Sequence, residues 1–118
     1  LVGAGGVGNA IVNYAGFRGR GFRIAVVFDN DPTKIGQKIN ELTILSTDQI
    51  KTKVSKMKIR IAMVAVPSDE AQTVTNKLVD AGIESILNYA PTSLTVPSKV
   101  RIQHIDPVVG LQHMTYYL

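Results

Sequence analysis

Apolar and polar positions follow two different periods along this chain, which predicts an α/β fold. Short continuous apolar runs are typical of strands that are buried on both faces. They occur at residues 1–2, 22–28, 42–45, 59–66, 83–89 and 100–105. Between them, apolar residues recur every three or four positions, as on one face of a helix. We therefore expect a Rossmann-type, doubly wound, mostly parallel sheet with strand order 3-2-1-4-5-6.

The first helix is predicted over residues 6–15. Its apolar residues fall at i, i+3, i+4, i+7 and i+8, a spacing that places them on one face. These residues are Val7, Ala10, Ile11, Tyr14 and Ala15. We expect this face to pack on the sheet.

Two further helices follow the third and fourth strands. Ser46 and Gln49 have the spacing of a capping box before a helix with Ile50, Val54 and Met57 on one face. Ser68 is the expected N-cap of the next helix, which Gly82 ends. Residues 33–36 form at most a short helical turn.

A glycine motif directly follows the first strand. Gly3, Gly5 and Gly8 form G-x-G-x-x-G, in which the first glycine permits a tight turn, the second lets a pyrophosphate approach, and the third lets the helix pack closely. Asp29 follows the second strand about 20 residues further on, where this fold places a carboxylate for ribose hydroxyls. The motif alone is a weak signal, and a turn carboxylate bound to nearby N–H groups remains an alternative for Asp29.

In this fold the ligand lies at the carboxyl ends of strands 1 and 4, where four turns converge. The candidate cofactor-binding residues are Gly3, Ala4, Gly5, Gly6, Val7, Gly8, Asp29, Val66, Pro67, Asn88, Tyr89, Ala90 and Pro91. Because a carboxylate at Asp29 would repel a 2′-phosphate, NAD(H) is favoured over NADP(H) as the cofactor.

Composition narrows the remaining choices. The 118 residues fit one domain, and the absence of cysteine excludes disulfides and thiolate chemistry. No apolar run approaches the ~18 residues of a membrane span, so we expect a cytoplasmic protein with no membrane partner. The net charge of +4 permits an anionic ligand, but the basic residues are scattered. Only two residues precede Gly3, whereas strands usually have ~5–6, so we expect a truncated first strand.

No catalytic group emerges from the sequence. A dehydrogenase needs a proton donor or acceptor beside the nicotinamide. His104 alternates with Val100 and Ile102 in a strand, which indicates a core or edge histidine, and His113 lies in the terminal segment. We expect a binding domain and not an enzyme; a dehydrogenase fragment and a CoA-binding domain are the alternatives.

A final helix is predicted over residues 108–118, after Asp106-Pro107. Val108, Leu111, Met114 and Leu118 form an apolar stripe, and little polar surface remains. Packing on the domain's own edge and burial against another subunit explain this pattern equally well.

Several segments together resemble the NAD(H)-binding domain of the Rex family of redox-sensing transcriptional repressors. They are Gly3–Gly8, Asn13–Phe17, Phe28–Pro32, Val66-Pro67, Asn88–Pro91 and Leu111–Leu118. Their order and spacing carry the resemblance, which covers essentially the whole chain. It implies an NAD(H)-binding domain at 1–106, a C-terminal dimerisation helix at 107–118, and an upstream winged-helix domain that lies outside this chain.

The resemblance also implies a mechanism. Rex proteins are homodimers that exchange C-terminal helices; NADH binds tightly and releases operator DNA, whereas NAD⁺ binds more weakly. The glycine loop would hold the pyrophosphate and Asp29 the adenine ribose, with Pro67 and the turn 88–91 around the nicotinamide. Tyr14 and Asp106 match positions of redox-dependent hydrogen bonding, although helix packing and an N-cap explain them equally well. Switch and dimer contacts would involve Tyr14, Asp106, Leu111, Met114 and Tyr117.

Overall fold

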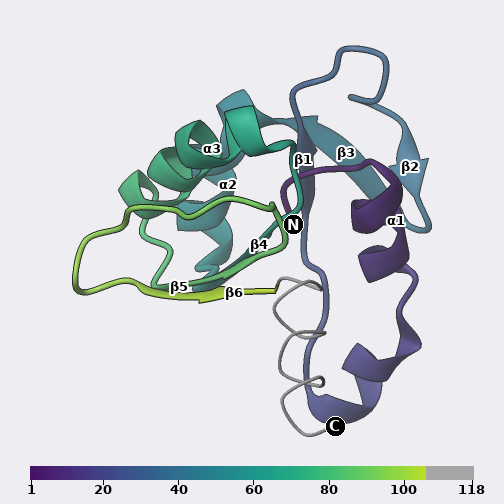
Figure 1. The fold of residues 1–118 in the computed structure, drawn as a ribbon. Helices are drawn as coiled ribbons and strands as arrows, with labels where there is room; N and C mark the ends of the chain where they lie inside the picture. The colour runs from purple at the N-terminus through teal and green to yellow at the C-terminus, as the bar shows by residue number, and fades with distance from the viewer. Residues whose placement is uncertain (106–118) are drawn as a thin grey trace, which may run out of the picture.

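The computed structural model describes residues 1–105, apart from the side chains of Ala15 and Arg18 (Figure 1). The elements are α1 (Gly6–Val12), the 3₁₀ helix η1 (Ala15–Arg20), β1 (Val27–Asp29), β2 (Lys38–Ile39), β3 (Leu42–Ser46), the 3₁₀ helix η2 (Thr47–Gln49), α2 (Ile50–Met57), β4 (Ile61–Val64), α3 (Ser68–Asp80), β5 (Ser85–Asn88) and β6 (Arg101–His104). The expected terminal helix, with Asp106, Leu111, Met114 and Tyr117, lies outside the described residues.

The sheet has the predicted strand order. β1 pairs in parallel with β3, and β4, β5 and β6 form a second parallel set. Val2 joins the two sets through parallel bridges to Phe28 and Val64. The order is therefore β3, β1, Val2, β4, β5, β6, which confirms the predicted 3-2-1-4-5-6. The sequence did not predict β2, a short antiparallel strand on the outer edge of β3.

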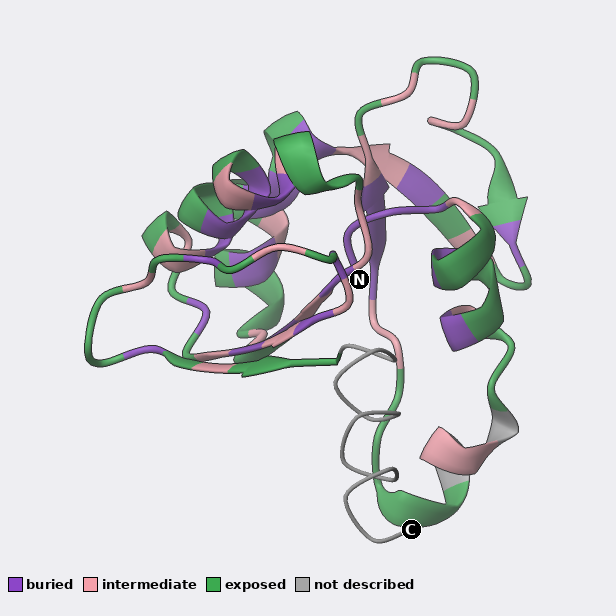
Figure 2. Cartoon of the chain, viewed as in Figure 1, coloured by how far each residue is buried: buried purple, intermediate pink, exposed green. Residues whose placement is uncertain are grey.

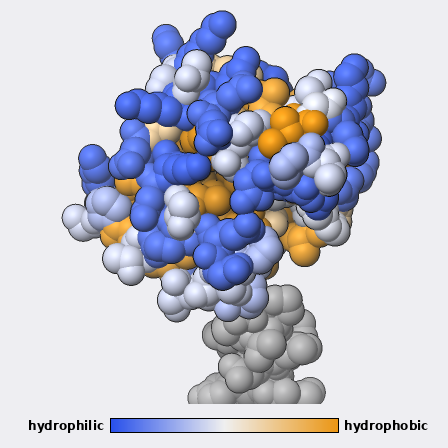
Figure 3. All heavy atoms as spheres, turned by 90° about the horizontal axis from the view of Figure 1, so that it is seen from above, coloured by the Kyte–Doolittle hydropathy of each residue, from blue (hydrophilic) through white to orange (hydrophobic). Residues whose placement is uncertain are grey.

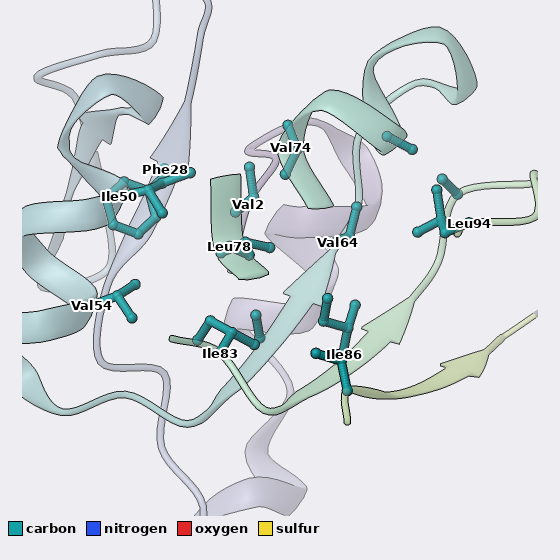
Figure 4. Close-up of a cluster of buried hydrophobic side chains, with 14 of the residues drawn as sticks. Val2, Phe28, Ile50, Val54, Val64, Val74, Leu78, Ile83, Ile86 and Leu94 are labelled. Carbon is teal, nitrogen blue, oxygen red and sulfur yellow. The ribbon is translucent and has the colours of Figure 1, made fainter. Parts of the chain in front are cut away.

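Two hydrophobic cores lie on the two faces of this sheet, as a doubly wound fold requires. Successive strand residues alternate between them: Val2 and Phe28 pack in the core under α2 and α3, whereas Leu1 and Val27 pack in the core under α1. Figure 4 shows the larger core, and Figure 2 shows the buried residues concentrated on the central strands and inner helix faces. The exposed faces of α2 and α3 carry mostly polar residues.

The helix ends confirm some of the predicted capping and correct the rest. Gly82 follows α3 with φ +105°, and the N–H of Ile83 donates to the carbonyl of Leu78, as in a Schellman motif. The expected N-cap Ser68 is wrong, because Pro67 occupies that position and no side chain caps the helix. The hydroxyl of Ser46 accepts the N–H of Asp48, and a 3₁₀ turn precedes α2.

The predicted inner face of the first helix is confirmed only at Ile11, which is buried. The helix ends at Val12, so Tyr14 and Ala15 lie beyond it, and Val7 and Tyr14 are 53% and 55% exposed. Ala10 is also exposed. The reason is a backbone contact: a Cβ at Gly8 would overlap the carbonyl of Gly3, so α1 lies against the loop through Gly8. This contact turns the helix so that Ile11, one turn later, faces the sheet. The side chain of Ala15 is outside the described set.

The amino edge of the sheet holds an apolar cavity of about 290 Å³. It lies between the segment 22–26, which is not strand, and the beginning of β4, and Leu1 also lines it. The backbone nitrogen of Leu1 donates to the carbonyl of Val26 at 3.1 Å. The second strand is shorter than predicted, since β1 begins at Val27 and residues 22–26 are not strand. Among the helices of residues 1–105, none has the length and hydropathy to cross a membrane.

Candidate functional site

The turns expected to form the site converge at the opposite, carboxyl edge of the sheet. The N–H of Gly3 donates to the carbonyl of Phe28 at 2.8 Å, and the N–H of Tyr89 donates to that of Val64 at 2.8 Å. Together with the bridges of Val2, these bonds align the carboxyl ends of neighbouring strands along the same edge of the sheet. The turns at 3–8, 29–32, 65–68 and 89–91 therefore begin side by side, as the sequence predicted. Figure 3 looks onto the molecule from above Figure 1 and shows mostly hydrophilic side chains on that face, with small hydrophobic areas between them.

Two glycines of the motif are required by the protein's own backbone. Gly3 has φ +110°, a conformation that residues with a Cβ rarely adopt, and a Cβ there would overlap the carbonyl of Ala65. A Cβ on Gly8 would likewise overlap the carbonyl of Gly3. These contacts hold the strand end, the loop and α1 together.

The other two glycines face open space. A Cβ on Gly5 would meet only the ammonium nitrogen of Lys34, at 3.9 Å, and a Cβ on Gly6 would meet nothing within 4 Å. Gly5 has an extended backbone with φ −79°, which any residue adopts. Packing and backbone conformation therefore do not explain these glycines, whereas close approach of a ligand to the loop does.

Asp29 is fixed against the glycine loop by both of its carboxylate oxygens. Oδ2 accepts the N–H of Ala4 at 2.8 Å, and Oδ1 accepts the N–H of Asp31 at 2.9 Å. Each carboxylate oxygen has a further lone pair, and the side chain is half-buried. The carboxylate is thus oriented by the backbone and still able to accept hydroxyl groups. Both interpretations from the sequence, a turn carboxylate and a ribose ligand, fit this geometry.

The far side of the loop is formed by the turn between β4 and α3. Val66 is half-buried, and Pro67 is exposed at the beginning of α3. Nδ2 of Asn30 donates to Oε1 of Glu70 at 2.9 Å, so the turn after β1 is tied to the first turn of α3. This bond joins the two turns on either side of the glycine loop.

Asn88 shapes the last turn of the site from inside. Its side chain is fully buried, Oδ1 accepts the N–H of Ala90 at 2.9 Å, and Nδ2 lies 3.1 Å from the carbonyl of Ala90 and 3.0 Å from Nδ1 of His104. The predicted site residues of this turn differ in exposure: Tyr89 is half-buried, Ala90 is buried and Pro91 is exposed. The Asn88 side chain therefore holds the turn, and the turn itself is what a ligand can reach.

Sequence reasoning missed one residue beside the loop, Lys34. It lies in the turn after Asp29, in a segment that the pattern predicted only as a short helical turn. No motif identifies such a lysine, because its position depends on how the turn folds back over Gly5. Within residues 1–105, no group of three His, Asp or Glu side chains could hold a metal ion. The apolar cavity at the amino edge is not part of this site.

Comparison with known proteins agrees with this architecture. Residues 1–92 match the family model of the CoA binding domain. The redox-sensing transcriptional repressor Rex of Chloroflexus aurantiacus is 50% identical over all 118 residues, and that of Carboxydothermus hydrogenoformans is 48% identical over 116 residues. The chain spans 56% of the length of each of these curated relatives.

Solved structures of a Rex-family repressor named RSP have the same fold. RSP is 33% identical with a TM-score of 0.91, and the match covers 98% of this chain and 56% of RSP. RSP in complex with β-NADH, and in complex with β-NAD⁺ and operator DNA, each match with a TM-score of 0.90. The chain therefore belongs to the CoA-binding domain family, and it is similar over its whole length to part of the Rex redox-sensing repressors.

Proposed function

We propose that this chain is the NAD(H)-sensing domain of a redox-responsive transcriptional repressor. The observation that supports this proposal most directly is the arrangement around the glycine loop. Gly5 and Gly6 face open space, while Asp29 is held beside them by the N–H of Ala4. A dinucleotide needs both features, since its pyrophosphate approaches the loop and its ribose hydroxyls bind a carboxylate. RSP, which shares the fold, has been crystallised with NADH and with NAD⁺.

Sensing requires different affinities for the two redox forms, because a ligand shifts a conformational equilibrium only by its differential affinity. NAD⁺ carries a positive charge on the nicotinamide, and NADH does not. The turns around 66–67 and 89–91 would frame this ring with apolar groups, and desolvating a cation there costs more than desolvating a neutral ring. The chain would thus bind NADH more tightly, and no hydride transfer is required.

The response would reach DNA through other parts of the protein. We propose that the protein is a cytoplasmic repressor in which an upstream domain binds operator DNA. Residues 1–106 would form the sensor domain. Residues 107–118 would form a helix that is shared between the subunits of a homodimer. The exposed Val7 and Tyr14 on and after α1 support an interface on this side. Leu111, Met114 and Tyr117 would provide apolar contacts, and Tyr14 and Asp106 would form the switch pair.

Calorimetric titration with NADH, NAD⁺ and CoA tests the sensor proposal. We expect NADH to bind at least about tenfold more tightly than NAD⁺, a difference of about 1.4 kcal/mol, and CoA to bind weakly. Equal affinity for NADH and NAD⁺ would contradict sensing. Tighter binding of CoA would favour the CoA alternative, and steady oxidation of NADH by a carbonyl substrate would favour the dehydrogenase alternative.

Sedimentation equilibrium tests the dimer. Met114→Asp together with Leu111→Asp would place two charges in the apolar stripe, so we expect these changes to convert a dimer to a monomer. Lys99→Asp, an exposed charge change on the loop before β6, serves as the matched control. A dimer that survives both substitutions would place the interface elsewhere.

A further inference from the structure

The turn after β1 is held against the glycine loop by hydrogen bonds. Asp29 binds the N–H groups of Ala4 and Asp31, and Oδ1 of Asp31 in turn accepts the N–H and hydroxyl of Thr33 at 2.9 and 2.7 Å. The N–H of Lys34 donates to the carbonyl of Asp31 at 2.9 Å, which closes a helical turn. The backbone of Lys34 is therefore fixed relative to the loop through a chain of hydrogen bonds.

The side chain of Lys34 reaches over the loop from this turn. Its ammonium nitrogen lies 3.9 Å from the Cβ position of Gly5, and apart from it the space above that glycine is open. The side chain is half-buried, and in the described part of the chain no carboxylate lies within 4.0 Å of its nitrogen. The nearby carboxylate of Asp31 has its pKa lowered mainly by its hydrogen bonds to Thr33, with a smaller effect from the charge of Lys34. The ammonium thus faces the open space without a close ion-pair partner.

We propose that Lys34 binds the pyrophosphate of the dinucleotide at the glycine loop. The inference rests on the nucleotide site proposed above. Backbone N–H groups of the loop offer hydrogen bonds but no full charge, whereas the pyrophosphate carries two negative charges. An ammonium held over Gly5 supplies charge-assisted hydrogen bonds, which are stronger than neutral ones. Lys34 therefore supplies the full positive charge that the backbone N–H groups of the glycine loop lack.

Lys34 should not contribute to the discrimination between NADH and NAD⁺. NADH and NAD⁺ have the same pyrophosphate, so Lys34 contributes equally to both affinities. Loss of its charge lowers both without changing their ratio. Discrimination between the redox forms remains at the nicotinamide end, beside the turns at 66–67 and 89–91.

The phosphate that Lys34 binds could also belong to the ribose, as in NADPH or CoA, and truncated ligands distinguish the two sources. We compare Lys34→Met with the wild type by calorimetry with NADH, NAD⁺, ADP-ribose and NADPH, and by ligand-observed NMR with adenosine. We expect about a tenfold loss of affinity for NADH, NAD⁺ and ADP-ribose. Adenosine, which has no phosphate, binds both proteins equally.

Two further variants separate charge from structure. Lys34→Arg keeps the charge and recovers most of the affinity, while Lys56→Met removes an exposed charge from α2, away from the loop, and leaves all affinities unchanged. Binding of NADH to Lys34→Met is also less sensitive to salt than binding to the wild type.

Several results would overturn the proposal. Unchanged affinity of Lys34→Met for ADP-ribose, or an equal loss with adenosine, would show that Lys34 does not act through the pyrophosphate. A loss confined to NADPH would assign it to a ribose phosphate. If the wild type binds NADH and only the Lys34 effect is missing, this inference fails and the proposed function stands; if the wild type binds no nucleotide, both fail.

Discussion

The carboxylate of Asp29 accepts the backbone N–H of Ala4 at 2.8 Å, which joins the end of β1 to the loop that follows the first strand. The two residues lie 25 positions apart and meet because their strands are neighbours in the sheet. The same carboxylate also accepts the N–H of Asp31. One side chain thus sets the shape of the loop, the direction of the next turn and the position of the negative charge beside them.

Asp29→Asn tests this arrangement, because an amide has only one acceptor oxygen for the two N–H groups of Ala4 and Asp31. We expect the free energy of unfolding to fall by about 1–2 kcal/mol, measured by urea denaturation, together with weaker binding of NADH. Asp48→Asn, an exposed carboxylate at η2 away from the loop, is the control and should change neither quantity by much. Full stability of the Asp29 variant would mean that its hydrogen bonds do not hold the loop.

The glycine motif makes a prediction that separates folding from binding. Gly3→Ala should destabilise the domain by about 2–4 kcal/mol, because it combines a positive φ with a backbone overlap. Gly5→Ala should keep the melting temperature and lower the affinity for NADH by about tenfold or more, since its Cβ enters only open space. Gly19→Ala, also in open space but outside the site, is the control. Normal NADH binding by Gly5→Ala would contradict a ligand at the loop.

Lys58 offers a stability prediction independent of any ligand. It ends α2 in the left-handed conformation, with φ +53°, and is exposed. Lys58→Gly should therefore raise the free energy of unfolding by about 1 kcal/mol, because glycine adopts this conformation without steric cost. Lys56→Gly, within the helix, should lower it by about 1 kcal/mol. Chemical denaturation of both variants checks the opposite signs, and equal effects would contradict the assigned helix end.

The strand order and the convergence of the turns followed from the sequence because they depend on patterns with a fixed period. Buried parallel strands have no polar face, and the apolar runs at 1–2, 22–28 and 59–66 show this clearly. Arg60 interrupts one run without disturbing it, because it lies on the surface and pairs with Glu84. The Asp29 interaction was predictable in position, although its partners Ala4 and Asp31 were not.

The details that the sequence did not predict depend on contacts between distant backbones. The outward position of Val7 follows from the close contact of Gly8 with Gly3, which a helical pattern does not encode, and Tyr14 is exposed beyond the end of α1 at Val12. The strand β2 is only two residues long, and Lys38 is exposed, so no alternation marks it. Lys34 reaches Gly5 only because Asp31 folds the turn between them.

The position of Val2 has a mechanical consequence. Val2 bridges in parallel to Phe28 of β1 and to Val64 of β4, and so connects the β3–β1 half of the sheet to the β4–β6 half. Gly3 follows Val2 immediately, so a ligand that reduces the motion of the glycine loop would also stabilise the pairing between the two halves of the sheet. Slower hydrogen exchange of the Val2 amide in the presence of a nucleotide would report this stiffening.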